Sequence, residues 1–136
     1  MKKILTTILA LSFVFIFTSC SMTTDSVVKN LNKAGYDMDV ISDSSGDSKL
    51  QLKQIKISIE ETYNKTLEGD ILTVIEAKNQ EDQRVFLYEF EKENDAITFY
   101  DILINTIESE KPEKVISIDG NVVVFASDSK ALADAK

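Results

Sequence analysis

The 136-residue sequence contains no histidine and no tryptophan, and it has one cysteine, one proline and four glycines. Without histidine, the chain lacks the usual general base at neutral pH and the commonest protein ligand of zinc and copper. With one thiol, at Cys20, no disulfide can form within the chain. Ser-His-Asp and Cys-His catalysis are therefore excluded, and the fold must be held together without cross-links.

Positive charge is also scarce. Fifteen lysines and arginines stand against 23 aspartates and glutamates, and the formal net charge is −8. An acidic surface repels phosphate backbones and anionic lipid headgroups. We therefore expect no nucleic-acid binding, and no attachment to a membrane through a basic patch.

The longest apolar run lies at the start of the chain. Lys2 and Lys3 precede the almost wholly apolar residues 4–17, and the small residues Thr18 and Ser19 follow. This run is shorter than the roughly 20 residues of a membrane-spanning helix. The order basic, apolar, small is typical of a secretory signal peptide, which we expect to cover residues 1–19.

Residues 17–20, "FTSC", resemble the lipobox of bacterial lipoproteins, although Phe17 stands where that family usually has leucine. The resemblance implies that Cys20 receives a diacylglyceryl group and becomes the first residue of the mature chain. It also implies an anchor at the extracytoplasmic face of a bacterial membrane, for which two acyl chains suffice. The alternatives are an uncleaved anchor, or an ordinary signal peptide with a chance cysteine.

The remaining chain predicts a single domain. Residues 20–24 are expected to be the lipidated cysteine and a short polar tether, and residues 25–136 one α+β domain. Asp25 or Ser26 is expected to cap a first helix that stops at Gly35, because glycine adopts the left-handed conformation of a helix end.

A strand at residues 36–40 and a polar loop at 43–48 follow. Residues 50–67 fit both a helical stripe and a strand alternation, and we favour the helix because its stripe covers more of the segment. The later elements are a hairpin, a helix capped by Asn94, a second hairpin and a short helix capped by Asp128. The two hairpins are expected at 71–78 with 84–91, and at 115–118 with 121–126 around Asp119-Gly120.

The stripe of the helix after Asn94 consists of apolar residues at helical spacing: Ile97, Tyr100, Leu103, Ile104 and Ile107. From Tyr36 the predicted order is β, α, β, β, α, β, β, which indicates an α+β fold with an antiparallel sheet packed on helices in two layers. The first six elements also match a ferredoxin-like fold, to which a C-terminal hairpin strand and a short helix would be added.

Three segments, "LNKAGYDMDV", "YEFEKENDAITFYDIL" and "GNVVVFASDSKALADA", occur in this order. Together with the lipobox they resemble small lipoproteins of unknown function from low-GC bacteria. The resemblance implies a location and a type of domain. It supplies no catalytic, cofactor or ligand residue to transfer to this chain.

Two groups of residues near the start of the domain are candidate sites. Ser26 and Lys29 spell S-x-x-K, the nucleophile motif of penicillin-binding proteins, but the companion motifs S-D-N and K-T-G are absent. We favour a helix cap and a solvated lysine. Four aspartates could offer oxygens to calcium, although no EF-hand pattern is present, and a solvated face is the favoured interpretation: Asp37, Asp39, Asp43 and Asp47.

Two further groups lie near residue 90. A dense acidic run could supply a carboxylate pair as in glycosidases, but we expect it to face solvent at a helix N-terminus; it comprises Glu89, Glu91, Glu93 and Asp95. Phe86, Tyr88 and Phe90 share one strand face and could line an apolar groove. We favour a role in the core beneath a helix.

The sequence therefore favours a non-enzymatic, lipid-anchored envelope domain that binds a protein or a small ligand, with no cofactor and no metal site. The alternatives are a carboxylate-based envelope enzyme and a self-associating scaffold. A deep pocket with converging carboxylates favours the enzyme. An exposed apolar patch favours a partner, and a flat, uncovered strand edge favours self-association.

Overall fold

The computed structural model describes residues 22–43, 46–107 and 111–136. The predicted signal peptide and Cys20 lie outside the described residues. The helices are α2 (Thr24–Lys33), α3 (Gly46–Tyr63), α4 (Glu93–Thr106) and α5 (Ser129–Ala135), and η1 (Pro112–Lys114) is a 3₁₀ turn. The strands are β1 (Asp37–Ser42), β2 (Ile71–Lys78), β3 (Arg84–Phe90), β4 (Ile116–Asp119) and β5 (Val122–Ala126).

The strands form a single sheet in the order β1-β2-β3-β5-β4, and every pairing is antiparallel. The predicted α+β class, an antiparallel sheet packed on helices, is confirmed, and so is the order of elements from β1 onward. The ferredoxin-like arrangement is wrong, because there the two strands that a helix connects are parallel and another strand lies between them, whereas β1 and β2 are antiparallel neighbours. Here the connection through α3 returns to the same end of the sheet, where Ser42 of β1 pairs with Thr73 of β2.

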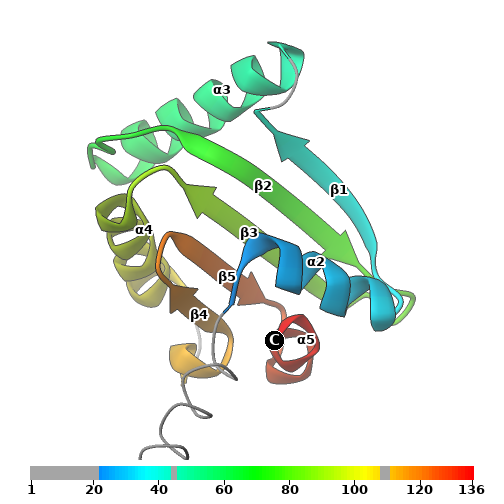
Figure 1. The fold of residues 1–136 in the computed structure, drawn as a ribbon. Helices are drawn as coiled ribbons and strands as arrows, with labels where there is room; N and C mark the ends of the chain where they lie inside the picture. Colours follow the sequence, from blue (N-terminus) through cyan, green and yellow to red (C-terminus); the bar gives the residue numbers. More distant parts are fainter. Residues whose placement is uncertain (1–21, 44–45, 108–110) are drawn as a thin grey trace, which may run out of the picture.

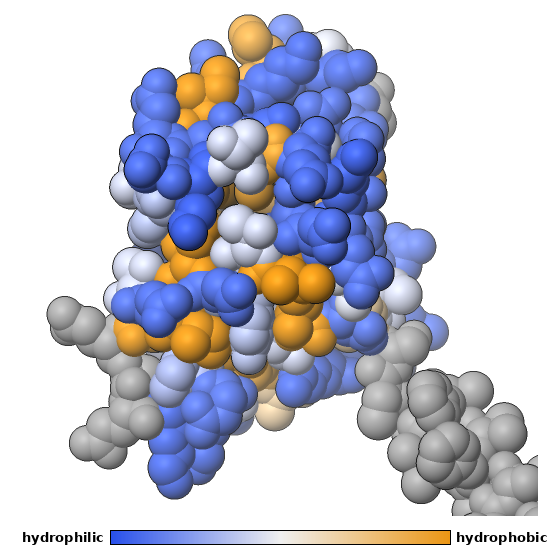
Figure 2. Space-filling model, turned by 90° about the vertical axis from the view of Figure 1, so that its left-hand side faces the viewer, coloured by the Kyte–Doolittle hydropathy of each residue, from blue (hydrophilic) through white to orange (hydrophobic). Residues whose placement is uncertain are grey.

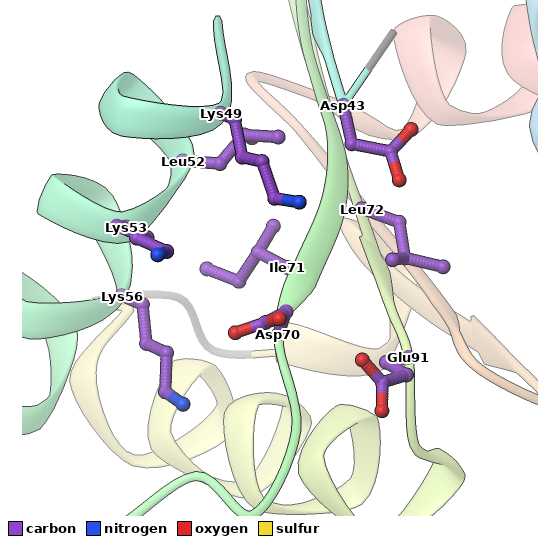
Figure 3. A pocket seen from close by; sticks show the side chains of 9 residues that line it. All are labelled: Asp43, Lys49, Leu52, Lys53, Lys56, Asp70, Ile71, Leu72 and Glu91. Carbon is purple, nitrogen blue, oxygen red and sulfur yellow. The ribbon is translucent and has the colours of Figure 1, made fainter. Parts of the chain in front are cut away.

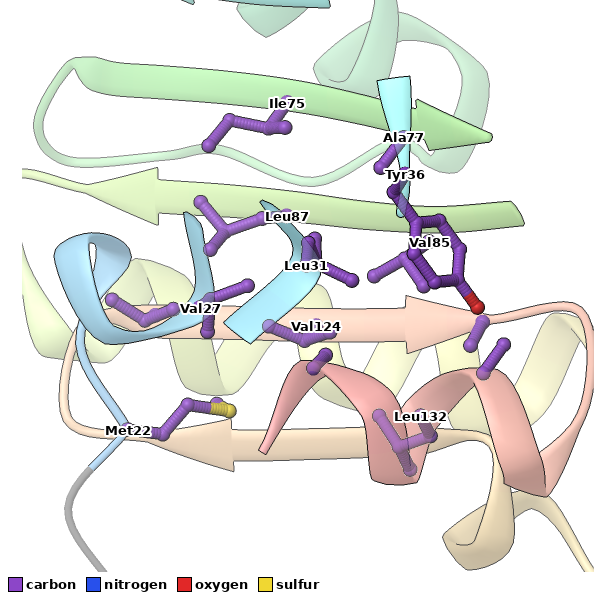
Figure 4. Close-up of a cluster of buried hydrophobic side chains, with 14 residues drawn as sticks. Met22, Val27, Leu31, Tyr36, Ile75, Ala77, Val85, Leu87, Val124 and Leu132 are labelled. Atoms are coloured by element: carbon purple, nitrogen blue, oxygen red, sulfur yellow. The ribbon is translucent and has the colours of Figure 1, made fainter. Parts of the chain in front are cut away.

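Helices cover both faces of the sheet, so a layer of helices and an apolar core lie on each face (Figure 1). Helices α2 and α5 lie on one face, and α3 and α4 lie on the other. The α2/α5 core, drawn in Figure 4, consists of Met22, Val27, Leu31, Tyr36, Ile75, Ala77, Val85, Leu87, Val122, Val124, Ala126, Ala131, Leu132 and Ala135. The α3/α4 core consists of Leu52, Ile59, Leu67, Ile71, Val74, Phe90, Ala96, Phe99, Ile102, Leu103, Ile116 and Val123.

The N-cap of α2 is Thr23, and not Asp25 or Ser26 as predicted. The Thr23 hydroxyl accepts a hydrogen bond from the backbone N–H of Ser26 at 3.1 Å, and the Ser26 hydroxyl accepts one from the N–H of Thr23 at 2.9 Å. This capping box satisfies two N–H groups that a helix start leaves unpaired. Gly35 follows the helix with φ +85°, as expected of a helix stop.

The predicted polar tether is wrong over residues 22–24. Met22 is only 8% exposed and belongs to the α2/α5 core, whereas Thr23 caps α2 and Thr24 is its first residue. The sequence pattern missed this because a single methionine among polar residues has no periodicity. The folded domain therefore begins at Met22 at the latest.

Residues 50–63 are helical as favoured, but α3 already begins at Gly46, inside the predicted loop, and it ends at Tyr63, so residues 64–67 of the predicted helix lie outside it. The helical stripe is confirmed at Leu52 and Ile59, which are buried, while Tyr63 is 37% exposed. Ile57 is 51% exposed, so the apolar residues whose alternation suggested a strand are not buried together on one face.

Helix α4 differs from its prediction in its cap and in its buried face. Its N-cap is Lys92, without a side-chain hydrogen bond, and not Asn94. Ala96, Phe99, Ile102 and Leu103 are buried, whereas Ile97 of the predicted stripe is 45% exposed. Apolar residues surround much of this helix, and the aromatic side chains of β3 select the Phe99 face.

The C-terminal hairpin and helix follow the prediction closely. Asp119 pairs with Val122, so the two central turn residues are Gly120 and Asn121, one position later than expected. Gly120 has φ +57°, as the first central residue of a primed hairpin turn requires. Asp128 caps α5 by accepting the N–H of Ala131 at 2.8 Å, as predicted.

Candidate functional site

A cleft of about 220 Å³ lies between α3 and one end of the sheet (Figure 3). Its walls come from α3, from the end of β1, from the start of β2 and from the residue after β3. The lining residues are Asp43, Lys49, Leu52, Lys53, Lys56, Asp70, Ile71, Leu72 and Glu91.

Lysines form the helical wall of the cleft. Lys49, Lys53 and Lys56 are four and three residues apart on α3, which places them on one face of the helix. Lys56 lies 3.9 Å from Glu60 on the same helix. Among the described residues, no ion pair joins Lys49 or Lys53 to a carboxylate.

Carboxylates form the opposite wall. Asp43 follows β1, Asp70 precedes β2, and Glu91 follows β3. Backbone hydrogen bonds at the sheet end fix their positions: the N–H of Asp43 donates to Leu72 O at 3.2 Å, and the N–H of Glu91 donates to Asp70 O at 2.8 Å. The backbones carrying the three carboxylates are therefore set by the sheet itself.

The floor of the cleft is apolar. Leu52 and Ile71, which are each 3% exposed, form this floor, whereas the Leu72 side chain lies on the other side of β2 (Figure 3). The cleft is smaller than the roughly 300–1,000 Å³ of pockets that hold drug-sized ligands. It therefore suits a small ligand with charge at both ends and little bulk between them.

The acidic run is divided among different roles. Asp95 is 2% exposed, and its carboxylate accepts the N–H groups of Glu68 and Gly69, each at 2.8 Å. The predicted solvent-facing position is therefore wrong for Asp95. Its partners lie 26 and 27 residues earlier in the chain, so no local pattern could have identified them.

Asp95 fixes the segment that leads into Asp70 and β2. An added Cβ at Gly69 would lie 3.0 Å from Lys92 Cγ and 3.2 Å from Glu91 Cβ, so the segment passes close to the start of α4. This close approach admits only glycine without a shift of neighbouring atoms. Asp95 and Gly69 therefore fix the position of the backbone that leads into Asp70 of the carboxylate wall.

Glu89 and Glu91 lie two residues apart but have different surroundings. Glu89 is half-buried and accepts hydrogen bonds from the hydroxyl groups of Thr73 at 2.9 Å and Thr24 at 3.0 Å. Glu91 and Glu93 are exposed, as predicted, and Glu91 lines the cleft. The acidic run thus contributes one carboxylate to the cleft and no carboxylate pair.

The first two candidate sites have structural explanations. Ser26 completes the capping box of α2, and Lys29 is exposed, which agrees with the favoured interpretation of the S-x-x-K pattern. The four aspartates of the calcium hypothesis, Asp37, Asp39, Asp43 and Asp47, are all exposed. Across residues 22–43, 46–107 and 111–136, no group of three acidic residues is placed to hold a metal ion.

The aromatic row of β3 belongs to the α3/α4 core, as favoured. Phe90 is fully buried, and the ring centroids of Tyr88 and Phe90 lie 4.6 and 5.4 Å from that of Phe99 on α4. Burial raises the pKa of the Tyr88 phenol. Phe86 is half-buried and stacks on Phe125 of β5 with ring centroids 4.9 Å apart.

A shallower hollow of about 390 Å³ lies at the other end of the sheet and includes Asp37, Asp39 and Glu76. Its basic groups already have partners, since Arg84 Nη1 lies 3.6 Å from Glu76 and Lys78 Nζ lies 2.9 Å from Asp82. The hydrogen-bonded Lys78 ammonium lowers the pKa of Asp82. Ligand charges would have to compete with these pairs, which makes the α3 cleft the stronger candidate.

The cleft residues Lys49, Lys53, Lys56 and Asp70 were not among the candidate site residues predicted from the sequence. The spacing of the three lysines on the favoured helix is a signal that could have identified one wall. The opposite wall combines residues from three strand ends, and these meet only in the folded sheet.

Apolar surface at the strand-end side of the molecule is interrupted by hydrophilic side chains (Figure 2).

None of the helices in the described part of the chain is long and apolar enough to cross a membrane. Comparison with protein families, with curated proteins and with solved structures gives no match to this chain.

Proposed function

We propose that this chain is a bacterial lipoprotein, anchored through lipid on Cys20 at the extracytoplasmic face of the cell membrane. Its function is to bind a small ligand or an envelope partner, and not to catalyse a reaction. The lipobox-like "FTSC" supports the anchor. The observation that carries the proposal further is the position of Met22 in the fold.

Met22 is held by the sheet end as well as by the core. Its N–H donates to the Asp119 carboxylate at 2.6 Å, and the hydroxyl of Thr24 donates to Glu89 at 3.0 Å. The two residues from Cys20 to Met22 span at most about 7 Å when extended. A lipid on Cys20 would therefore hold this end of the sheet directly against the bilayer.

Binding is favoured over catalysis because of where the carboxylates lie. Catalytic acids and bases usually owe their reactivity to burial or to a close charge. The carboxylates of the cleft are exposed, and the buried Asp95 is engaged by two backbone N–H groups.

Edge-to-edge association has less support. The outer strand β1 carries the exposed charges Asp37 and Asp39, which oppose pairing with a second copy. The opposite edge strand, β4, has only four residues. Short and charged edges are common ways to prevent sheet extension.

Metabolic labelling with a radioactive fatty acid tests the anchor. We expect the wild-type chain to incorporate label and to fractionate with membranes, and Cys20→Ser to remain an unlabelled precursor. Ser21→Ala is the matched control, because it alters the neighbouring residue and leaves the thiol in place. Processing and anchoring of Cys20→Ser like the wild type would overturn the proposal.

A further inference from the structure

We propose that the α3 cleft binds a small zwitterion in which a compact anion and a primary ammonium group are joined by a short linker. The anion lies at Lys49 and Lys53, and the ammonium group lies at Asp70, whose side chain lies nearest the lysines in Figure 3. Phosphoethanolamine, free or as the headgroup of a phospholipid, has this chemistry. Only the choice between these two sources rests on the proposed function.

The arrangement of charge selects a dipolar ligand. Three lysines of α3 and three carboxylates from the strand ends line the cleft, so the lining side chains have no net formal charge. A simple anion would be attracted by one wall and repelled by the other, and the same holds for a simple cation. A zwitterion gains attraction at both ends, and the low-dielectric floor of Leu52 and Ile71 strengthens both interactions.

Two lysines of the cleft, Lys49 and Lys53, are available to bind an anionic group. Lys49 and Lys53 form no ion pair among the described residues, although both line a cleft with three carboxylates. The two charged walls thus stand apart and do not neutralise each other by direct contact. Lysine binds phosphate as a flexible point charge, and two lysines one turn apart can approach the same phosphate.

The carboxylate wall favours a primary ammonium group over a quaternary one. A primary ammonium offers three N–H donors, which exposed carboxylates accept. Quaternary ammonium groups are recognised by aromatic cages, and the lining of this cleft contains no aromatic residue. Phosphocholine is therefore expected to bind less well than phosphoethanolamine.

The cleft lies at the end of the sheet that carries Met22. Asp43 and Glu91 follow the ends of β1 and β3, and Met22 is bonded to Asp119, the last residue of β4. The antiparallel register brings all of these strand ends to the same end of the sheet. An anchor on Cys20 would therefore place the cleft near the headgroups of the same membrane.

Calorimetric titration of the mature protein, extracted in a non-ionic detergent, tests the site with phosphoethanolamine as the probe. We expect saturable binding that weakens about tenfold or more in Lys49→Gln/Lys53→Gln and in Asp70→Asn, since each change removes a charge-assisted contact. Lys29→Gln, an exposed lysine on α2, is the matched control and should bind like the wild type.

Three further probes complete the test: phosphate and ethanolamine each carry only one of the two charged groups, and phosphocholine carries a quaternary ammonium in place of the primary one. Inorganic phosphate, ethanolamine and phosphocholine are each expected to bind at least about tenfold more weakly than phosphoethanolamine. No saturable binding by the wild type, phosphate binding as tightly as the zwitterion, or an equal loss in Lys29→Gln would each overturn the proposal. Thermal melts of all variants confirm that weaker binding does not reflect unfolding.

Vesicles distinguish the two sources of the ligand. The protein is reconstituted in phosphatidylglycerol with or without phosphatidylethanolamine, and free phosphoethanolamine is titrated in. A lower apparent affinity in the presence of phosphatidylethanolamine assigns the cleft to the lipid headgroup, whereas equal affinities overturn the lipid source and assign it to free solutes. Because the detergent titration needs no anchor, its result is independent of the labelling of Cys20.

Discussion

The two faces of the sheet are packed differently. Val27, Leu31, Val85, Leu87 and Val124 of the α2/α5 core have no exposed surface at all. The α3/α4 core instead has a wide margin of partly buried apolar side chains: Ile41, Ile55, Tyr88, Tyr100, Ile104, Ile107, Val115, Ile118 and Phe125. The first face is closed, and the second is open at its margins.

The closed face is built from segments far apart in the sequence. Asn30 Nδ2 donates to Ala135 O at 3.3 Å, and the Tyr36 hydroxyl donates to Asp134 at 3.0 Å, so α2 and α5 are joined directly. Both helices are short, with 10 and seven residues, and the small side chains of Ala131 and Ala135 let them approach each other closely.

The open face uses longer helices that divide the sheet between them. Helix α3 has 18 residues and packs on β1 and β2, whereas α4 has 14 and packs on β3, β4 and β5. The candidate cleft lies at the start of β2, beside α3. The candidate cleft therefore belongs to the face that is only partly sealed.

The largest expected effect comes from a cavity in the closed face. Leu31→Ala is expected to lower the free energy of unfolding by about 2–5 kcal/mol, because a fully enclosed site cannot collapse around the lost methyl groups. Ile104→Ala, on the margin of the open face, should cost about 1 kcal/mol. Urea unfolding measures both, and equal costs would remove the distinction between the two faces.

The next effect concerns the buried carboxylate of the open face. Asp95→Ala leaves the N–H groups of Glu68 and Gly69 without their acceptor and should cost about 2–3 kcal/mol. Glu93→Ala, an exposed change in the same helical turn, should stay within about 0.5 kcal/mol. Urea midpoints compare the two, and a similar small shift in both would show that Asp95 does not brace the cleft.

The β4–β5 turn serves both faces, because successive residues of β5 point into opposite cores. Gly120→Val should destabilise the domain by about 1–2 kcal/mol, since a β-branched residue is strained at φ +57°. No atom lies within 4 Å of the added Cβ, so backbone strain is the main cost. Gly46→Val, which also has open space and no positive φ, is the control; equal urea midpoints for the two variants would contradict this explanation.

The smallest effect is a pH dependence of the closed face. Burial, together with the hydrogen bond to Asp134, raises the pKa of Tyr36 from 10.0 to about 12. The stabilisation is therefore fully present below pH 10 and is lost as the pH rises through about 12. Tyr36→Phe should cost about 0.5–1.5 kcal/mol at neutral pH and should remove this loss.

Ultraviolet absorbance of the phenolate, recorded against pH for wild type and Tyr36→Phe, isolates the titration of this residue. Tyr63→Phe, on the exposed end of α3, is the control and should keep the stability loss between pH 10 and 12. If Tyr36 ionises near pH 10, the contact between Tyr36 and Asp134 does not seal the closed face in solution.

Local signals in the sequence determined most of the elements. Gly35 stops α2 and Asp128 caps α5, and each acts on groups within a few residues. The hairpin of β2 and β3 was predicted to within one residue from alternation alone. Turn and cap preferences are short-range, and they are therefore readable without knowledge of the fold.

Only the tertiary structure decided which surfaces are buried and where the charges meet. The sequence allowed more than one apolar face on α4, and contact with Tyr88 and Phe90 selected the Phe99 face. Pairing of β1 with β2 and the hydrogen bonds of Asp95 join residues at least 26 positions apart, and Lys53 and Asp70 line one cleft although they are distant in the sequence. Composition and periodicity do not predict these long-range arrangements. The interactions contribute free energy only after the sheet has brought the distant segments together.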